Sequence, residues 1–105
     1  MRYQDVSPTA AFAARADARV VDVREPDEFT GELGHIPGSE LVPLATIGSA
    51  ASTWDRDKPL VLVCRSGARS GRAAQALAGA GFRRVMNLAG GMLAYRAAGL
   101  PVEGS

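Results

Sequence analysis

Residues 60–70 are the most informative part of the sequence: Leu60-Val61-Leu62-Val63-Cys64-Arg65-Ser66-Gly67-Ala68-Arg69-Ser70. Its first five residues form an unbroken apolar run that ends at the only cysteine of the chain. A parallel strand that is covered by helices on both faces has this continuous apolar character. The small and basic residues that follow predict a loop leading into a helix. We therefore expect a buried parallel strand with Cys64 at its carboxyl end, where ligands of such sheets bind.

Predicted strands and helices alternate on both sides of this segment. We expect helices over 8–17, 70–80 and 92–98, a helical turn over 26–29, and a helix or loop over 46–53. We expect strands over 19–23, 40–42, 60–64 and 85–88, and a turn over 34–38. The inward side of the helix over 70–80 should consist of Ala73, Ala74, Leu77 and Ala78, with a left-handed stop at Gly81. This alternation indicates an α/β fold with a mainly parallel sheet.

Length, composition and charge narrow the class of protein. We expect residues 1–105 to form a single domain, and the 47% of apolar residues is enough for a buried core. The formal net charge of +1 argues against a protein that coats nucleic acid or an acidic membrane. No apolar run approaches the ~18 residues of a membrane span, and none of signal-peptide length begins at the N-terminus. A single cysteine cannot form an internal disulfide, and so we expect a cytoplasmic protein. We expect it to be a monomer or a weak homodimer.

The loop after Cys64 has the character of an anion site. The small residues at 66–68 let successive backbone N–H groups point inward at the positive end of the following helix. Arg65 and Arg69 add two permanent positive charges. A helix N-terminus stabilises an anion by roughly 0.3–1 kcal/mol, and a cation at ~4 Å attracts it by about 4 kcal/mol at an effective dielectric constant of ~20. An ordinary thiol, with a pKa of about 8.5, is only a few per cent ionised at neutral pH. We therefore expect Cys64 to be a reactive thiolate at pH 7 and not an inert core thiol.

Four segments, in order and at suitable spacing, resemble the rhodanese domain over nearly the whole chain. The first rhodanese signature is similar to VVDVREPDEF at 20–29, and the turn that follows it is similar to GHIPGS at 34–39. The active-site strand and loop resemble LVCRSGARS at 62–70. The closing signature resembles LAGGM at 88–92 and GLPV at 99–102. One departure is Tyr95, which lies in the last helix where many members have Trp, and we interpret it as a packing change.

The resemblance implies a rhodanese-like three-layer fold, in which a five-stranded, mainly parallel sheet has helices on both faces. It also implies a thiosulfate sulfurtransferase. The Cys64 thiolate would attack the outer sulfur of thiosulfate or another sulfane donor, and the resulting persulfide would pass its sulfur to cyanide, a thiol or a protein acceptor. The residues implied to bind the donor and persulfide are Arg65, Ser66, Gly67, Ala68, Arg69 and Ser70. Because the chain has no second cysteine, the acceptor must come from outside it. No cofactor or metal is required, and neither nucleic acid nor a membrane is an expected partner.

Three residues near the first signature have other candidate roles. The resemblance suggests that Arg24 pairs with Glu28 and holds the first turn, which is a structural role. Asp22 lies near the same sheet edge and could contact the site. His35 is the only histidine, and one His and one Cys are too few ligands for a metal. We interpret His35 as a turn residue bonded to the backbone, and leave open whether Asp22 or His35 assists catalysis.

Three other functions are compared with the sulfurtransferase. A cysteine phosphatase or arsenate reductase of the Cys-x5-Arg type needs arginine at the position of Ser70, whereas Arg69 comes one residue too early and the loop has no acidic residue to protonate a leaving group. An inactive binding module would usually have lost the cysteine, which is present here. A persulfide carrier for a protein acceptor would use the same chemistry, and the sequence does not separate it from a thiosulfate:cyanide enzyme.

Overall fold

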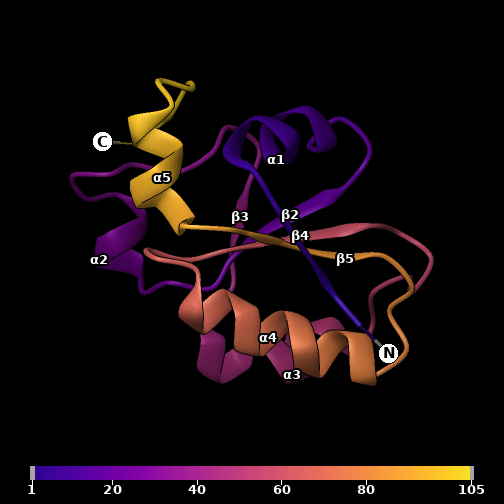
Figure 1. Cartoon of the computed structure of the whole chain (residues 1–105). Coiled ribbons are helices and arrows are strands. Elements are labelled where there is room, and N and C mark those ends of the chain that lie inside the picture. Colours follow the sequence, from indigo (N-terminus) through magenta and orange to yellow (C-terminus); the bar gives the residue numbers. More distant parts are fainter. Residues whose placement is uncertain (1, 105) are drawn as a thin grey trace.

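The computed structural model describes residues 2–104 and shows a parallel five-stranded sheet with helices on both faces (Figure 1). The strands are β1 (Gln4–Val6), β2 (Arg19–Asp22), β3 (Glu40–Leu41), β4 (Leu60–Val63) and β5 (Val85–Leu88). Their order in the sheet is β1-β5-β4-β2-β3, and every pair is parallel. Helices α3 (Ile47–Ala51) and α4 (Ala68–Gly79) lie on one face, and α1 (Pro8–Ala14) and α5 (Gly91–Ala97) lie on the other. The short elements α2 (Pro26–Phe29) and η1 (Leu44–Thr46) complete the fold. The predicted three-layer α/β fold is confirmed.

Strand β4 is the buried centre of the sheet. It pairs with β2 on one side and β5 on the other, and all four of its residues are buried. Leu60 and Leu62 pack into the core beneath α3 and α4, while Val61 and Val63 pack into the core beneath α1 and α5. Side chains of a strand alternate between faces, and here both faces are covered, which explains the unbroken apolar run. Cys64 directly follows β4 and therefore lies at the carboxyl edge of the sheet, next to its central strand.

Helix α4 packs on the sheet through small side chains. Its buried residues include the predicted inward set, Ala73, Ala74, Leu77 and Ala78. Gly81 follows the helix with a left-handed φ of +99°, as expected for a helix stop. The helix begins at Ala68, two residues earlier than predicted, and so Arg69 and Ser70 belong to its first turn. Only residues 65–67 then separate Cys64 from the helix.

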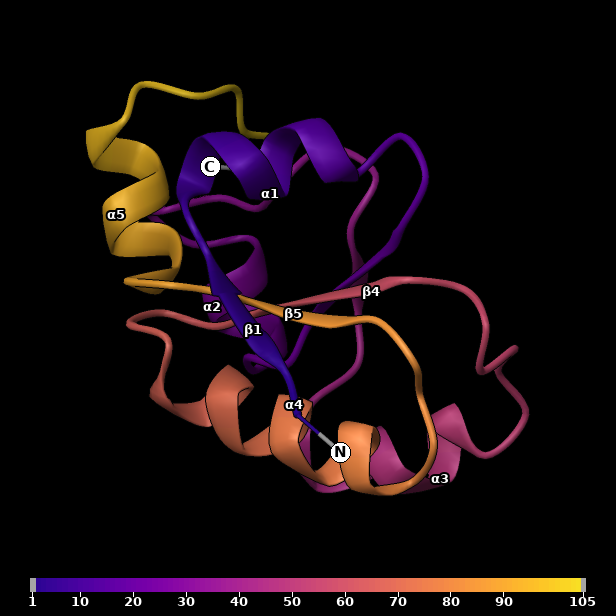
Figure 2. The ribbon, with the colours of Figure 1, turned by 45° about the vertical axis from the view of Figure 1, so that its right-hand side comes forward.

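The largest difference from the sequence prediction is β1, which was missed. Its residues, Gln4-Asp5-Val6, contain no apolar run because β1 is an edge strand with two exposed residues (Figure 2). Helix α1 begins as expected, with the Ala10 N–H donating to the Ser7 hydroxyl at 3.1 Å, but it ends at Ala14 and not near Asp17.

Within residues 2–104, none of the helices has the length and apolar character needed to cross a membrane.

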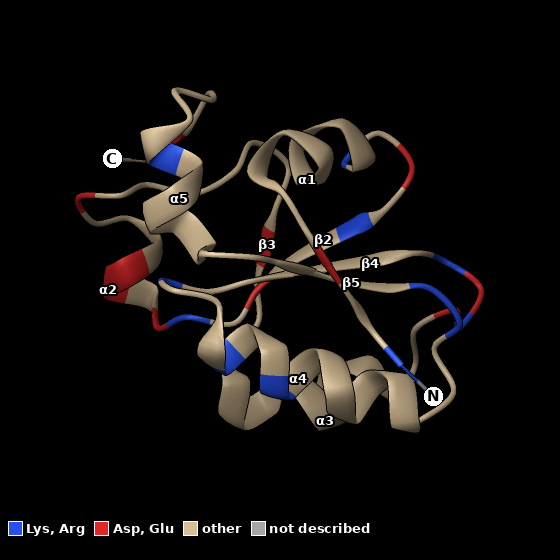
Figure 3. Ribbon diagram, viewed as in Figure 1, with Lys and Arg blue, Asp and Glu red and all other residues tan. Residues whose placement is uncertain are grey.

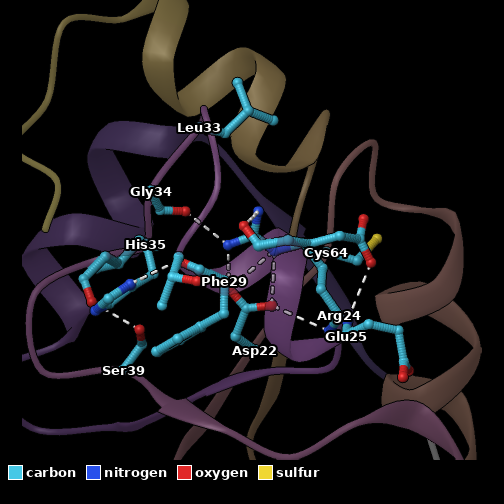
Figure 4. Close-up of polar contacts among 12 residues, drawn as sticks. Asp22, Arg24, Glu25, Phe29, Leu33, Gly34, His35, Ser39 and Cys64 are labelled. Atoms are coloured by element: carbon cyan, nitrogen blue, oxygen red, sulfur yellow. Dashed lines mark hydrogen bonds and ion pairs between the residues drawn. The ribbon is translucent and has the colours of Figure 1, made fainter. Parts of the chain in front are cut away.

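A buried ion pair fixes the end of β2. Arg24 and Asp22 are 1% and 0% exposed, and the guanidinium nitrogens Nε and Nη2 donate to the Asp22 carboxylate at 2.7–3.1 Å. Arg24 also donates to the backbone carbonyls of Glu28 at 3.1 Å and Gly34 at 2.7 Å (Figure 4). The prediction that Arg24 pairs with the Glu28 side chain is therefore wrong, because the guanidinium group binds the Asp22 carboxylate instead. Arg24 still has the structural role of tying α2 and the following turn to the sheet, since a buried charge needs a full set of partners.

His35 is bonded to the backbone of this turn, as the sequence predicted. Its Nδ1 lies 2.9 Å from the Phe29 carbonyl oxygen, and its ring stacks on Phe29 with centroids 3.7 Å apart. Its backbone forms an antiparallel bridge with Glu103, which brings the C-terminal segment back to the turn. In the part of the chain that the structure describes, no group of three His, Cys, Asp or Glu side chains is placed to hold a metal ion.

Candidate active site

The Cys64 sulfur lies inside the loop that joins β4 to α4. The residue is 1% exposed, and the chain wraps around its side chain over residues 65–70. The Gly67 N–H donates to Sγ at 3.1 Å and the Ser70 hydroxyl donates at 3.3 Å. The same hydroxyl also lies 3.3 Å from the Gly67 carbonyl oxygen. The loop thus surrounds the sulfur with donors, which is the arrangement that an anionic sulfur requires.

These donors lower the pKa of the thiol in spite of its burial. Burial raises the pKa of Cys64, but the Ser70 hydroxyl and the backbone N–H groups of Ser70, Gly67 and Ser66 favour the thiolate and bring the pKa below its ordinary value. The sequence argument assigned most of this effect to the two arginines. The structure assigns it first to hydrogen bonds of the loop, and the expected direction of the shift is the same.

Helix α5 supports the loop from the opposite side of the sheet. The Met92 N–H donates to the Cys64 carbonyl at 2.9 Å, and the Leu93 N–H donates to the Arg65 carbonyl at 3.1 Å. A Cβ at Gly91 would lie 2.4–2.5 Å from these two carbonyl groups, and Gly91 has a φ of +59°. Only glycine lets the helix approach so closely. The sequence segment 88–92 is therefore tied directly to the backbone of the cysteine loop.

Asn87 and Asp5 also support the loop, and sequence reasoning missed both. The Asn87 side-chain amide, which is 4% exposed, donates to the Gly67 carbonyl at 3.2 Å and to the Asp5 carboxylate at 2.9 Å. Its own Oδ1 has no partner among the described residues. Asp5 and Asn87 are paired in the register of β1 with β5, so recognising β1 would have placed them together. Asn87 thus binds the carbonyl group of Gly67, whose φ is +101°, while the N–H group of Gly67 donates to the cysteine sulfur.

Arg69 forms an ion pair with a residue that the sequence did not predict as its partner. Its Nη1 and Nη2 each donate to one oxygen of Glu28 at 2.8 Å, in a two-bond ion pair between α4 and α2. The pair holds the pKa of Glu28 at about 2, chiefly through the hydrogen bond from Arg69, and raises the pKa of Arg69 further above its usual range. Figure 3 shows the acidic α2 beside the basic start of α4.

A cavity of about 200 Å³ adjoins this ion pair. The residues that line it are Arg24, Asp27, Glu28, Gly31, Glu32, Leu33 and Arg65. Arg65 directly follows Cys64 and is exposed, and no ion pair to it is found within residues 2–104. The cavity therefore lies next to the cysteine loop, which it meets at Arg65.

Comparison with known families agrees with this architecture. A family model described as "Rhodanese-like domain" matches residues 8–98. The chain belongs to this family. The rhodanese-like domain of this chain superposes on a rhodanese-related protein of Thermoplasma volcanium with a TM-score of 0.87, 26% identity, and coverage of 98% of this chain and 100% of that one.

Three curated relatives of this rhodanese-like domain share more sequence with it. YqhL of Bacillus subtilis is 45% identical over 74 residues, which are 70% of this chain and 57% of YqhL, so that the chain spans little more than half of that protein. A protein of Allochromatium vinosum named "Sulfurtransferase" is 40% identical, with coverage of 87% of this chain and 83% of the relative. The "Thiosulfate sulfurtransferase GlpE" of Ectopseudomonas mendocina is 38% identical, with coverage of 90% and 86%.

The structure gathers most of the predicted site residues around one sulfur atom. Residues 65–70 enclose Cys64, and of these Gly67 and Ser70 contact Sγ directly. Asp22 is fully buried and bonded to Arg24, and His35 is bonded to Phe29. None of the hydrogen bonds of Asp22 or His35 within residues 2–104 reaches Cys64.

Proposed function

We propose that this rhodanese-like domain is a sulfurtransferase that holds a sulfane sulfur on Cys64 as a persulfide. The observation that supports this proposal most strongly is the set of donors around Sγ, from the Gly67 N–H at 3.1 Å and the Ser70 hydroxyl at 3.3 Å. These donors favour a thiolate, which is the nucleophilic form of cysteine. Relatives named sulfurtransferase and thiosulfate sulfurtransferase support the same reaction class.

The proposed reaction has two displacements at sulfur. In the first, the Cys64 thiolate attacks the outer sulfur of thiosulfate, the S–S bond of thiosulfate breaks, and sulfite leaves with the electron pair. The product is a Cys64 persulfide anion. In the second, cyanide attacks the terminal sulfur, thiocyanate leaves, and the Cys64 thiolate is restored. A thiolate acceptor reacts in the same way and becomes a persulfide itself. No external oxidant or reductant is needed.

The loop residues have distinct roles in this scheme. The backbone of residues 65–70 surrounds the sulfur and stabilises negative charge on the thiolate and persulfide. The hydroxyl of Ser70 adds a further donor to the sulfur. Arg65 and Arg69 are the candidate ligands of an anionic donor, and Arg69 must first leave Glu28. The same chemistry serves a small thiol or a protein acceptor, and the cytoplasmic location stays a prediction.

Phosphatase chemistry is not favoured by this arrangement. The position at which a Cys-x5-Arg loop has its arginine is Ser70, whose hydroxyl donates to the cysteine sulfur. Arg69 points its guanidinium at Glu28. A phosphoryl group needs a cation that encloses it, and neither residue provides one.

Turnover with two acceptors tests the proposal. Thiocyanate formation from thiosulfate and cyanide is measured for the wild-type chain and for Cys64→Ser, and a thiol acceptor replaces cyanide in a parallel assay. We expect turnover with at least one acceptor in the wild type and none in Cys64→Ser. Equal rates in the two proteins would refute a role of Cys64 in sulfur transfer.

A further inference from the structure

The two arginines of the cysteine loop differ in their availability to a donor. Arg69 is bound by Glu28 through two N–H···O bonds of 2.8 Å, whereas Arg65 is exposed and has no ion pair within residues 2–104. A two-bond arginine–carboxylate pair is the strongest geometry of this interaction. An anionic donor that is to use Arg69 must therefore displace a carboxylate that already occupies the same guanidinium.

Glu28 is a persistent competitor at neutral pH. Its side chain is 27% exposed and that of Arg69 is 32% exposed, so the pair is partly shielded from water. Because the pKa of Glu28 is lowered to about 2, its carboxylate stays ionised at every pH at which the enzyme would work. The pair connects α2 with the first turn of α4, which directly follows the loop that encloses Cys64.

The adjoining cavity adds further negative charge. Its lining contains three carboxylates, from Asp27, Glu28 and Glu32, and two guanidinium groups, from Arg24 and Arg65. Arg24 is buried and bonded to Asp22, which leaves Arg65 as the open cation of the lining. Like charges placed together in a binding site cost several kcal/mol of affinity in general. A small dianion therefore meets more repulsion here than a donor with one charge or none.

We propose that Glu28 is a specificity-determining residue that occupies Arg69 and so slows the reaction with dianionic donors such as thiosulfate, and that the domain prefers donors with at most one negative charge, such as an organic hydropersulfide or thiosulfonate. This inference rests on the proposed sulfurtransferase function. With a hydropersulfide, the Cys64 thiolate attacks the outer sulfur, the S–S bond breaks, and the organic thiolate leaves. The proton of the terminal SH remains on the transferred sulfur, and no net oxidation occurs.

Two donors of similar shape and different charge test the proposal. Methanethiosulfonate has a methyl group in place of one charged oxygen of thiosulfate, and thus one negative charge instead of two. The second-order rate constant for the gain of one sulfur atom by Cys64 is measured in a single turnover for each donor, at constant ionic strength and without an acceptor. The ratio of the two rate constants is the donor preference.

Glu28→Gln is the decisive variant, because glutamine can still accept the Glu25 N–H that now donates to Glu28 at 3.0 Å. We expect the thiosulfate rate constant to rise at least about fivefold and the methanethiosulfonate rate constant by less than about twofold, since like-charge repulsion grows with donor charge. Glu25→Gln is the matched control. It removes one negative charge at the same end of α2, but no ion pair between Glu25 and Arg69 is found within residues 2–104, so its donor preference should equal that of the wild type.

An unchanged donor preference in Glu28→Gln would overturn the proposal. An equal fall of both rate constants would also overturn it, because that result indicates a purely structural role. If circular dichroism shows that Glu28→Gln is unfolded, Glu28→Asp replaces it. The shorter carboxylate cannot keep both bonds to Arg69, so the preference should move in the same direction by less, and no movement would refute the inference. If the wild type gains sulfur from neither donor, the proposed function itself fails. If the wild type gains sulfur but Glu28→Gln leaves the donor preference unchanged, only the proposed role of Glu28 is refuted.

Discussion

Cys64 combines burial with a lowered pKa. An apolar site alone would raise the pKa of a thiol, and the hydrogen bonds of residues 66–70 reverse that effect. The Ser70 hydroxyl is the one side-chain donor among them, at 3.3 Å from Sγ. The lowered pKa of Cys64 therefore comes first from the Ser70 hydroxyl and the backbone N–H groups of the loop, and not from the two arginines.

Ser70→Ala should weaken the nucleophile without removing it. A hydrogen bond to a charged group contributes about 1.5 kcal/mol, so we expect the rate of Cys64 alkylation at pH 7 to fall by about tenfold and its pH profile to move to higher pH. The measurement is the rate of reaction with a small alkylating reagent as a function of pH. Ser66→Ala is the control, because Ser66 acts only through its backbone N–H. Identical pH profiles for the two variants would contradict this account.

Strand β5 and helix α5 support the cysteine loop from a neighbouring part of the sheet. Asn87 of β5 donates to the Gly67 carbonyl, and the first turn of α5 donates to the carbonyls of Cys64 and Arg65. The loop carbonyls are thus bound from outside, which leaves the loop N–H groups directed at the sulfur. This division of the backbone groups is a property of the two elements together and not of the loop alone.

Asn87→Ala should loosen the loop. Two hydrogen bonds are lost, and we expect a decrease of about 1–3 kcal/mol in the free energy of unfolding and a several-fold slower alkylation of Cys64. Urea unfolding and alkylation kinetics measure the two effects. Asp5→Ala keeps the bond between Asn87 and Gly67 and should affect alkylation less. Unchanged alkylation in a folded Asn87→Ala variant would show that Asn87 does not position the loop.

Gly91→Ala should disrupt the junction of α5 with the loop. The added Cβ would lie 2.4 Å from the Arg65 carbonyl oxygen, and we expect a decrease of about 2–4 kcal/mol in the free energy of unfolding. Gly99→Ala is the matched control, since Gly99 also has a positive φ, +73°, but no atom within 4 Å of the added Cβ. It should cost only about 1 kcal/mol, the strain of the left-handed backbone. Equal losses in the two variants would contradict the proposed close approach.

Across the whole molecule, ion pairs act both within one segment and between segments that are distant in the sequence. Arg24 and Asp22 fix the end of β2 in the interior, and Arg69 joins α4 to Glu28, which lies 41 residues earlier in the chain. Formal charges nearly cancel over the chain, with a net charge of +1. The Arg69–Glu28 pair therefore affects both the candidate donor site and the stability of the fold.

The contribution of Glu28 to stability should depend on pH. Its pKa is lowered from 4.5 to about 2 in the folded protein, so the stabilisation is present in full above pH 4.5 and is lost as the pH falls towards 2. Because the side chain is 27% exposed, we expect about 1 kcal/mol at neutral pH. Urea unfolding of the wild type and Glu28→Gln at several pH values should give a difference that shrinks with acidification. A difference that is constant between pH 7 and pH 2 would contradict this assignment.

The sequence predicted those features that have a local signal. The apolar run at 60–64, the small residues at 66–68 and the helix that follows indicated the fold and the cysteine loop. Strand β1 was missed because an edge strand with polar residues has no such signal. The partners of Arg69 and Gly67, which are Glu28 and Asn87, come from other elements, and their contacts depend on tertiary packing. The error at Arg24 has the same origin, since the sequence contains several nearby carboxylates and only packing selects Asp22.

The intact mass of the chain after incubation with a sulfane donor, without reductant, tests the central claim most directly. We predict that the wild type gains the mass of one sulfur atom, that cyanide removes it with formation of thiocyanate, and that Cys64→Ser gains nothing. No gain of mass in the wild type, together with slow alkylation of Cys64 at neutral pH, would contradict the account and favour a binding module without catalytic activity.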